Sequence, residues 1–147
     1  MLFRSAFVMS QSLFNLGWGL LADRRGFRAV FVGAVALWIA TALVLMSADS
    51  FAMLVAIFVG LGAGLGGFQL SAQNLVLEFG ARSNLPLRIA VANSASELVG
   101  AVGPLLGGVL AVTASYASVF WTAIAFQLAA LVVVLRYVRE PRHRSAS

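Results

Sequence analysis

The sequence predicts an all-α integral membrane protein, and composition is the first reason. Of the 147 residues, 61% are hydrophobic and only 10% are charged, so too few polar side chains are present to cover a soluble globule. Second, the apolar residues gather in stretches long enough to cross a bilayer as helices. Third, nearly all charges lie in the turns between these stretches or in the tail after the last one. Helices are expected rather than open β-structure, because lipid leaves unpaired backbone groups without partners.

Five stretches reach the length of roughly 20 residues that a membrane-spanning helix requires. We expect one transmembrane domain over residues 1–147, with helices at about 5–22, 29–47, 51–77, 89–112 and 117–135 and a cytoplasmic tail at 136–147. The first stretch is not a removable signal peptide, because it contains polar residues and ends in a charged turn instead of a small-residue cleavage site.

The five predicted helices differ in polarity in a regular order. The first, third and fourth carry amide or carboxyl side chains in their interiors, whereas the second has only Thr41 and the fifth is nearly apolar. Polar groups within a bilayer usually face the interior of a bundle or a water-filled cavity. We therefore expect the first, third and fourth helices to line a cavity and the other two to face mostly lipid.

Glycine is concentrated in the third and fourth helices, often at intervals of four residues. Small residues at this spacing allow helix backbones to approach closely, and a proline would kink the fourth helix. Two interpretations stay open: the glycines serve tight packing, or they let the helices rock against one another as transport requires. The predicted packing and kink residues are Gly60, Gly64, Gly103, Pro104, Gly107 and Gly108.

The arginines indicate how the chain is oriented in the membrane. Nine of the ten lie in the 24–28 turn, the 82–88 turn or the tail from Arg136 onward. By the positive-inside rule this side, and with it the C-terminus, is cytoplasmic. We expect a multi-pass protein of the cell membrane, specifically a bacterial inner membrane. Five crossings leave Arg4 outside, on the wrong side, so we interpret the chain as a truncated part of a longer protein.

The composition also argues against several functions. The chain has no cysteine, which excludes disulfides and thiolate metal sites, and its single histidine, His143, lies in the polar tail. No acid pair, nucleophile–base group or phosphate-binding loop is visible, so we expect no enzyme activity, no cofactor and no metal. The net charge of +5 comes from arginines in two turns and the tail, so nucleic acid is not an expected partner.

A charged turn between the first two predicted helices carries the most specific signal. It contains Gly19, Asp23, Arg24, Gly26 and Arg28 in the spacing G-x-x-x-D-R-x-G-x-R. This pattern resembles the signature cytoplasmic loop of the major facilitator superfamily of transporters. Arginines that only set the orientation would not require two glycines and an aspartate at fixed offsets.

The resemblance implies a fold, a function and a role for the loop. Family members have twelve helices in two halves of six, and helices two to six of a half follow the same lining and outer order as the polarity described above. The implied function is secondary active transport of a small solute by alternating access. In the family, the aspartate and arginines of the loop latch the cytoplasmic side, and Glu78 is the expected partner of Arg24 or Arg28.

The sequence favours the C-terminal half of such a transporter, helices eight to twelve. In many family members the fourth helix of the first half has an arginine four residues before a glycine. In this chain the corresponding residue, four positions before Gly60 in the third predicted helix, is Ala56. An alternative is the N-terminal half, helices two to six, of a drug/proton antiporter, because residues 103–108 partly match the antiporter motif G-P-x-x-G-G. The lipid bilayer and the missing N-terminal helices of the same transporter are expected partners.

Three polar side chains are expected at one depth near the middle of the membrane. At about 1.5 Å of rise per residue, Glu97 lies about 13–14 Å beyond Arg88, and the same count places Gln69 and Asn15 at a similar depth. Transporter sites are expected there. The candidate site for a small-molecule substrate or a proton consists of Glu97, Gln69, Asn15, Gln73, Asn93 and Gln11.

Glu97 is the only ionisable residue well inside a predicted helix. Burial penalises the charged form of a carboxyl group, so Glu97 can gain or lose a proton as its access to water changes, as in a proton-coupled carrier. Alternatively it is a neutral acid that hydrogen-bonds Gln69 or Asn93 and holds helices together. A second class of function also stays open: a membrane assembly or regulatory subunit that transports nothing.

Overall fold

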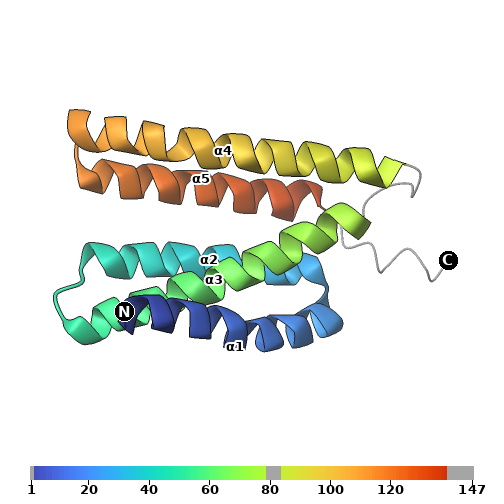
Figure 1. The fold of residues 1–147 in the computed structure, drawn as a ribbon, viewed down its shortest axis with the longest axis horizontal. Helices are drawn as coiled ribbons and strands as arrows, with labels where there is room; N and C mark the ends of the chain where they lie inside the picture. The colour runs from blue at the N-terminus through green and yellow to red at the C-terminus, as the bar shows by residue number, and fades with distance from the viewer. Residues whose placement is uncertain (1, 79–83, 139–147) are drawn as a thin grey trace.

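The computed structural model describes residues 2–78 and 84–138, and this part of the chain forms five helices (Figure 1). They are α1 (Leu2–Arg25), α2 (Phe27–Met46), α3 (Phe51–Glu78), α4 (Leu85–Thr113) and α5 (Tyr116–Tyr137). No strand occurs within the two described ranges. The predicted all-α fold class is therefore confirmed.

Local signals explain where the helices begin and end. A single residue, Gly26, separates α1 from α2. Helix α4 starts at Leu85, before the expected 89, because Pro86 suits the first turn, where a backbone N–H has no partner within the helix. Helix α5 starts after Ser115, whose Oγ accepts a hydrogen bond from the Ser118 backbone N–H at 3.2 Å.

Four of the described helices have the length and composition of a membrane span. They are α2, α3 up to Leu77, α4 and α5. Helix α1 is 24 residues long, but it begins beside Arg4, ends with Arg24 and Arg25, and contains several polar side chains. A membrane crossing by α1 therefore stays a prediction.

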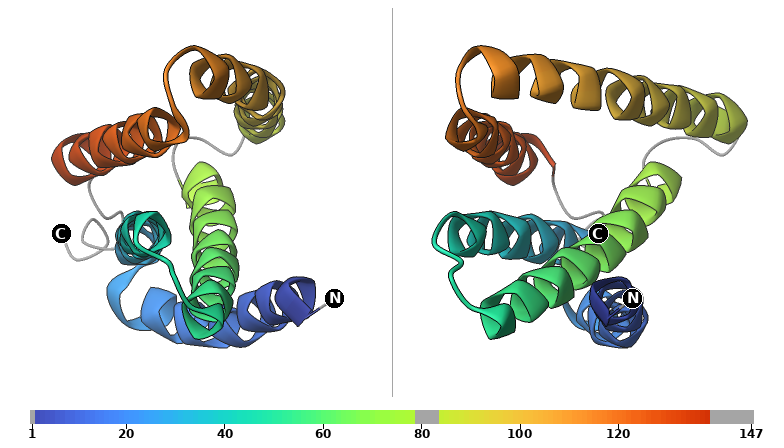
Figure 2. Two further views of the ribbon diagram at one scale, coloured as in Figure 1. Left: turned by 90° about the vertical axis from the view of Figure 1, so that its left-hand side faces the viewer. Right: turned by 60° about the vertical axis from the view of Figure 1, so that its left-hand side comes forward.

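Helices α1, α2 and α3 form the closely packed part of the molecule, which we call the trio. Helix α3 crosses between the other two and has its most extensive contacts with both of them (Figure 2). Small residues such as Ala34 and Ala63 fill the core. Two indole N–H groups fasten α3 from both sides: Trp18 of α1 donates to the Ala63 carbonyl at 2.8 Å and Trp38 of α2 to the Leu61 carbonyl at 3.2 Å.

The glycines of α3 form two contact faces instead of one. A Cβ atom at Gly60 or Gly64 would collide with side chains of α2. A Cβ atom at Gly62 or Gly66 would collide with α1, and at Gly62 the obstacle is the backbone carbonyl of Phe7. Helix α3 can approach both neighbours closely because each face lacks side chains at these points.

Helices α4 and α5 lie side by side as a hairpin, which we call the pair (Figure 1). The pair meets the trio through limited contacts between α2 and α5 and between α3 and α4. None of the 29 residues of α4 is buried, and large apolar side chains such as Leu98 are mostly exposed. The described chain therefore combines a packed trio with a loosely attached pair.

Candidate functional site

The turn between α1 and α2 explains why the loop motif contains Gly26. This residue has φ 82° and ψ 168°, and it is the only residue with a positive φ in the described part of the chain. Its N–H donates to the Ala22 carbonyl at 2.8 Å, which closes the end of α1. Residues with a side chain rarely adopt this conformation, so glycine is required where one helix follows another without a linker.

The charged residues of the motif point to different places. Asp23 and Arg24 are exposed at the end of α1. Arg28, in the first turn of α2, reaches across to α5 and donates from Nη2 to the Leu135 carbonyl at 2.7 Å. The expected partner of these arginines, Glu78, ends α3, but its side chain lies outside the described residues. The pairing with Glu78 stays a prediction.

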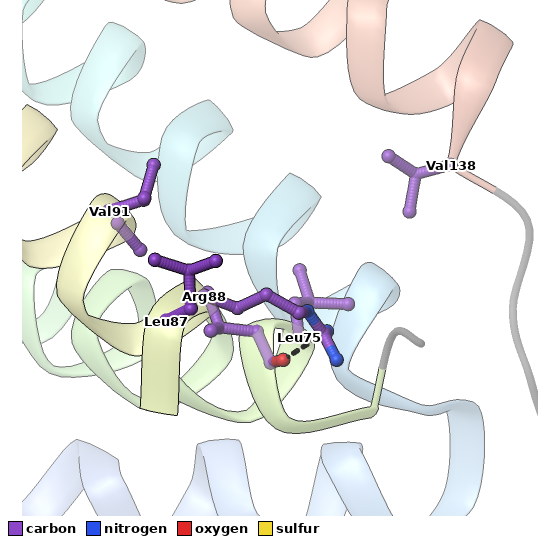
Figure 3. Close-up of a pocket in the computed structure, with 7 residues that line it drawn as sticks. Leu75, Leu87, Arg88, Val91 and Val138 are labelled. Atoms are coloured by element: carbon purple, nitrogen blue, oxygen red, sulfur yellow. Dashed lines mark hydrogen bonds between the residues drawn. The ribbon is translucent and has the colours of Figure 1, made fainter. Parts of the chain in front are cut away.

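Arg88 makes a second link of the same kind at the same end of the bundle. It lies in the first turn of α4 and donates from Nη2 to the carbonyl of Val76, near the end of α3, at 2.5 Å (Figure 3). The last carbonyls of a helix have no intrahelical partner and carry partial negative charge, which suits a guanidinium group. The two arginines therefore join the trio to the pair: α2 to α5 and α3 to α4.

A cavity of about 520 Å³ adjoins the second link. Its walls are apolar apart from the guanidinium group, and they come from α3, α4 and the residue after α5 (Figure 3). Among the described residues, Arg88 Nη1 is one of three buried side-chain atoms without a hydrogen-bond partner. The lining residues are Leu75, Val76, Leu87, Arg88, Val91, Ala92 and Val138.

Part of the predicted polar layer is assembled between α1 and α3. Gln11 donates from Nε2 to Gln69 Oε1 at 3.0 Å. Asn15 lies one turn further along α1 and packs against Gly66, where its Oδ1 would be 2.5 Å from an added Cβ atom. Gln73 follows Gln69 by one turn of α3, and both of these side chains are exposed. The result is an amide-rich strip on the surface that α1 and α3 share.

The two α4 residues predicted for this layer make no hydrogen bond with its α1 and α3 members. Asn93 and Glu97 are exposed on α4, and within the described ranges neither makes a hydrogen bond or ion pair. Helix α4 meets α3 instead near Arg88, between one and two turns from Asn93 and between two and three turns from Glu97. A shared site of Glu97 with Gln69 therefore stays a prediction.

The glycine–proline run of α4 also lies on an open surface. An added Cβ atom would meet nothing within 4 Å at Gly103 or Gly108, and at Gly107 it would lie 3.9 Å from Val119 Cγ1 of α5. Helix α4 continues through Pro104. In the described residues these positions pack against little, in contrast to Gly60 and Gly64 of α3.

Sequence reasoning missed the two arginine links and the two indole bonds. Arg28 was assigned to the loop and Arg88 was used only as an anchor for depth, since a carbonyl acceptor leaves no mark in the sequence. One sequence feature pointed to these links: each of the two arginines lies in the first turn of a helix. No cluster of three or more metal-binding side chains occurs in the described ranges.

Comparison with known proteins decides the family. The sequence profile of the Major Facilitator Superfamily matches residues 2–147. The chain belongs to this superfamily. A curated relative, the cephamycin export protein CmcT of Amycolatopsis lactamdurans, is 32% identical over 127 residues, which cover 86% of this chain and 26% of that protein. The chain thus spans about a quarter of the length of this relative. No solved structure matches it significantly.

Membership of the superfamily, together with the apolar helices, identifies a multi-pass membrane protein of the transporter class. It also gives the geometry a context. The turn at Gly26 lies in the segment whose spacing resembles the signature loop of the superfamily, and the Arg28 link joins this turn to the end of α5. The amide strip on α1 and α3 lies away from that end, along the membrane-spanning part of the trio.

Proposed function

We propose that this chain supplies five helices of a secondary transporter that moves a small solute by alternating access. The observation that carries the proposal is the hydrogen bond between Gln11 and Gln69. It places two amides side by side on an exposed surface of an otherwise apolar bundle. Exposed amides at membrane depth need water, a ligand or another helix, and each of these occurs at a transporter cavity.

Within that transporter we assign the chain to the C-terminal half, helices eight to twelve. Support comes from the order of polar and apolar helices and from Ala56 at the position where many first halves carry arginine. The competing assignment is helices two to six of a drug/proton antiporter, supported by residues 103–108. In the C-terminal assignment, the loop lies on the cytoplasmic side of a bacterial inner membrane. The other helices of the carrier complete the cavity.

The direction proposed is export of an amphiphilic small molecule. The support is the similarity to a protein named as a cephamycin exporter, which is 32% identical over the matched region. An amide-rich strip beside exposed apolar side chains suits a solute with both polar and apolar parts. Coupling to protons would depend on Glu97, the one carboxyl group in the middle of a predicted span.

The experiment uses the protein expressed from its intact gene, in inverted membrane vesicles with an imposed pH gradient. The probes are a cephamycin and an amphiphilic fluorescent dye. We expect saturable accumulation of at least one probe, and a large loss in Asp23→Asn, which keeps the size of the loop residue but removes its charge. Membrane insertion is measured in both. Normal insertion without transport of either probe would favour a non-transporting subunit.

A further inference from the structure

A groove at the Arg28 link lies apart from the amide strip described above. It lies between α1, α2 and α5 at the end of the bundle that carries the arginines, and its volume is about 580 Å³. Six of its lining residues are Leu21, Arg25, Arg28, Ala29, Val32 and Leu135. Two guanidinium groups therefore stand at a groove whose other walls are aliphatic.

The two arginines differ in how they are held. Arg28 is fixed by its bond to the Leu135 carbonyl, and its Nε is buried without a hydrogen-bond partner. Arg25 is exposed on the last turn of α1. A guanidinium group has five N–H donors in a planar fork that matches phosphate oxygens. The fixed guanidinium group of Arg28 and the adjustable one of Arg25 can together bind an anion at the rim of the groove.

The apolar wall runs from this rim into the membrane-spanning region. Ala29 directly follows Arg28 along α2, and Val32 and Gly33 lie about one turn further along the helix. Helices α2 and α5 are the two most hydropathic spans of the described chain. A ligand in this groove therefore meets positive charge at the membrane surface and hydrocarbon below it.

We propose that this groove binds an anionic phospholipid. The phosphate lies between Arg25 and Arg28, and one acyl chain follows Ala29 and Val32 along α2. Basic pockets between helices at a membrane interface suit anionic headgroups in this way. A free phosphate ion would leave the apolar wall unused, and a zwitterionic lipid would bring a cation toward the two arginines.

The test measures lipid binding to the purified protein, expressed from its intact gene, by native mass spectrometry. Phosphatidylglycerol is compared with phosphatidylcholine of the same acyl chains. We expect phosphatidylglycerol to bind more tightly, and Arg25→Gln to weaken it about five-fold, which is the contribution expected of one arginine in direct contact with an anionic headgroup. The matched control is Arg24→Gln, which removes the neighbouring exposed arginine outside the groove and should leave binding within about two-fold.

A second variant tests the apolar wall without changing charge. Ala29→Phe fills the groove and should weaken phosphatidylglycerol binding, with thermal unfolding measured to show that the helices stay packed. Three results would overturn the proposal: equal loss in Arg24→Gln and Arg25→Gln, equal affinity for the two lipids, or displacement of the lipid by inorganic phosphate. Binding is measured without transport, so failure here leaves the proposed export function standing.

Discussion

The trio and the pair contain similar residues but use them in opposite ways. Helices α3 and α4 are both long, apolar and rich in glycine. In α3, glycines such as Gly62 and Gly64 are buried against α1 and α2. In α4, Gly103 and Gly108 face open space, and no residue of that helix is buried.

This difference separates tightly packed helices from an open helix surface along the chain. The trio is held by close backbone approach and by indole bonds, so its packing tolerates little change. The surface of α4 carries Asn93, Glu97 and the glycine–proline run, and none of the residues of this helix is buried. We infer that the trio is the tightly packed part of the chain and that the pair is attached to it more loosely. The predictions below test that division.

The largest effect is expected from a side chain between α1 and α3. Gly62→Ala places a Cβ atom against the Phe7 backbone carbonyl, which cannot move without shifting α1. Such overpacking costs about 1–3 kcal/mol, so the thermal unfolding midpoint in detergent should fall by several degrees. Gly108→Ala is the matched control, because its new methyl group meets nothing within 4 Å. Equal destabilisation by both would mean that α4 is packed as tightly as α3.

The turn between α1 and α2 should be the next most sensitive point. At φ 82° and ψ 168°, Gly26 occupies a region open almost only to glycine, and another residue there costs about 1–3 kcal/mol. Gly26→Ala should therefore destabilise the trio. Gly26→Asn should do no better, because asparagine tolerates the left-handed helical region but not this ψ value. Rescue by asparagine, measured as a restored unfolding midpoint, would show that the turn adopts a different conformation.

The sequence predicts the fold class, but it predicts only some of the contacts between helices. Apolar length predicted the helices, because lipid leaves the backbone no other way to satisfy its hydrogen bonds. The four-residue spacing of Gly60 and Gly64 marked a close approach, but it did not reveal that Gly62 faces a different helix. Periodicity describes one helix at a time, and the identity of a neighbour depends on how the helices cross. The loop pattern predicted a turn at Gly26, and the structure shows there the positive φ that favours glycine.

The candidate site was less predictable for a similar reason. Counting residues gives depth along a helix but not the direction in which a side chain points. Gln69 was therefore placed at a plausible depth, and its hydrogen bond to Gln11 came only from the structure. Whether Glu97 joins this layer depends on the position of α4, which the described residues attach to α3 mainly near Arg88.

A smaller effect is expected from breaking the links between trio and pair. A hydrogen bond from a charged donor contributes about 1.5–3 kcal/mol. The Arg28 link is exposed and should lie at or below the lower limit, whereas the Arg88 link is partly buried and should contribute more. Arg28→Ala should speed hydrogen exchange in the last turn of α5, and Arg88→Ala in the last turn of α3. Arg136→Ala is the control, because it removes an arginine of the same end that makes neither link. Identical exchange patterns in the two link variants would contradict separate attachments.

The smallest change in stability is expected at Glu97, where the functional effect should be clear. Its side chain is exposed and makes no hydrogen bond within the described ranges, so Glu97→Gln should alter the free energy of unfolding by no more than about 0.5 kcal/mol. If Glu97 carries the coupling proton, the glutamine cannot titrate, and transport should lose its dependence on the pH gradient. Ser96→Ala, on the same exposed helix, should keep that dependence.

The comparison is made in vesicles that contain equal amounts of each protein, with and without an imposed gradient. Gradient-driven transport that persists in Glu97→Gln would remove the coupling role, while a large fall in its unfolding midpoint would show that Glu97 has a structural partner beyond the described residues. A stable but uncoupled variant would instead place the chemistry on the exposed face of α4. The pair would then contribute to the proposed site together with the amide strip of the trio.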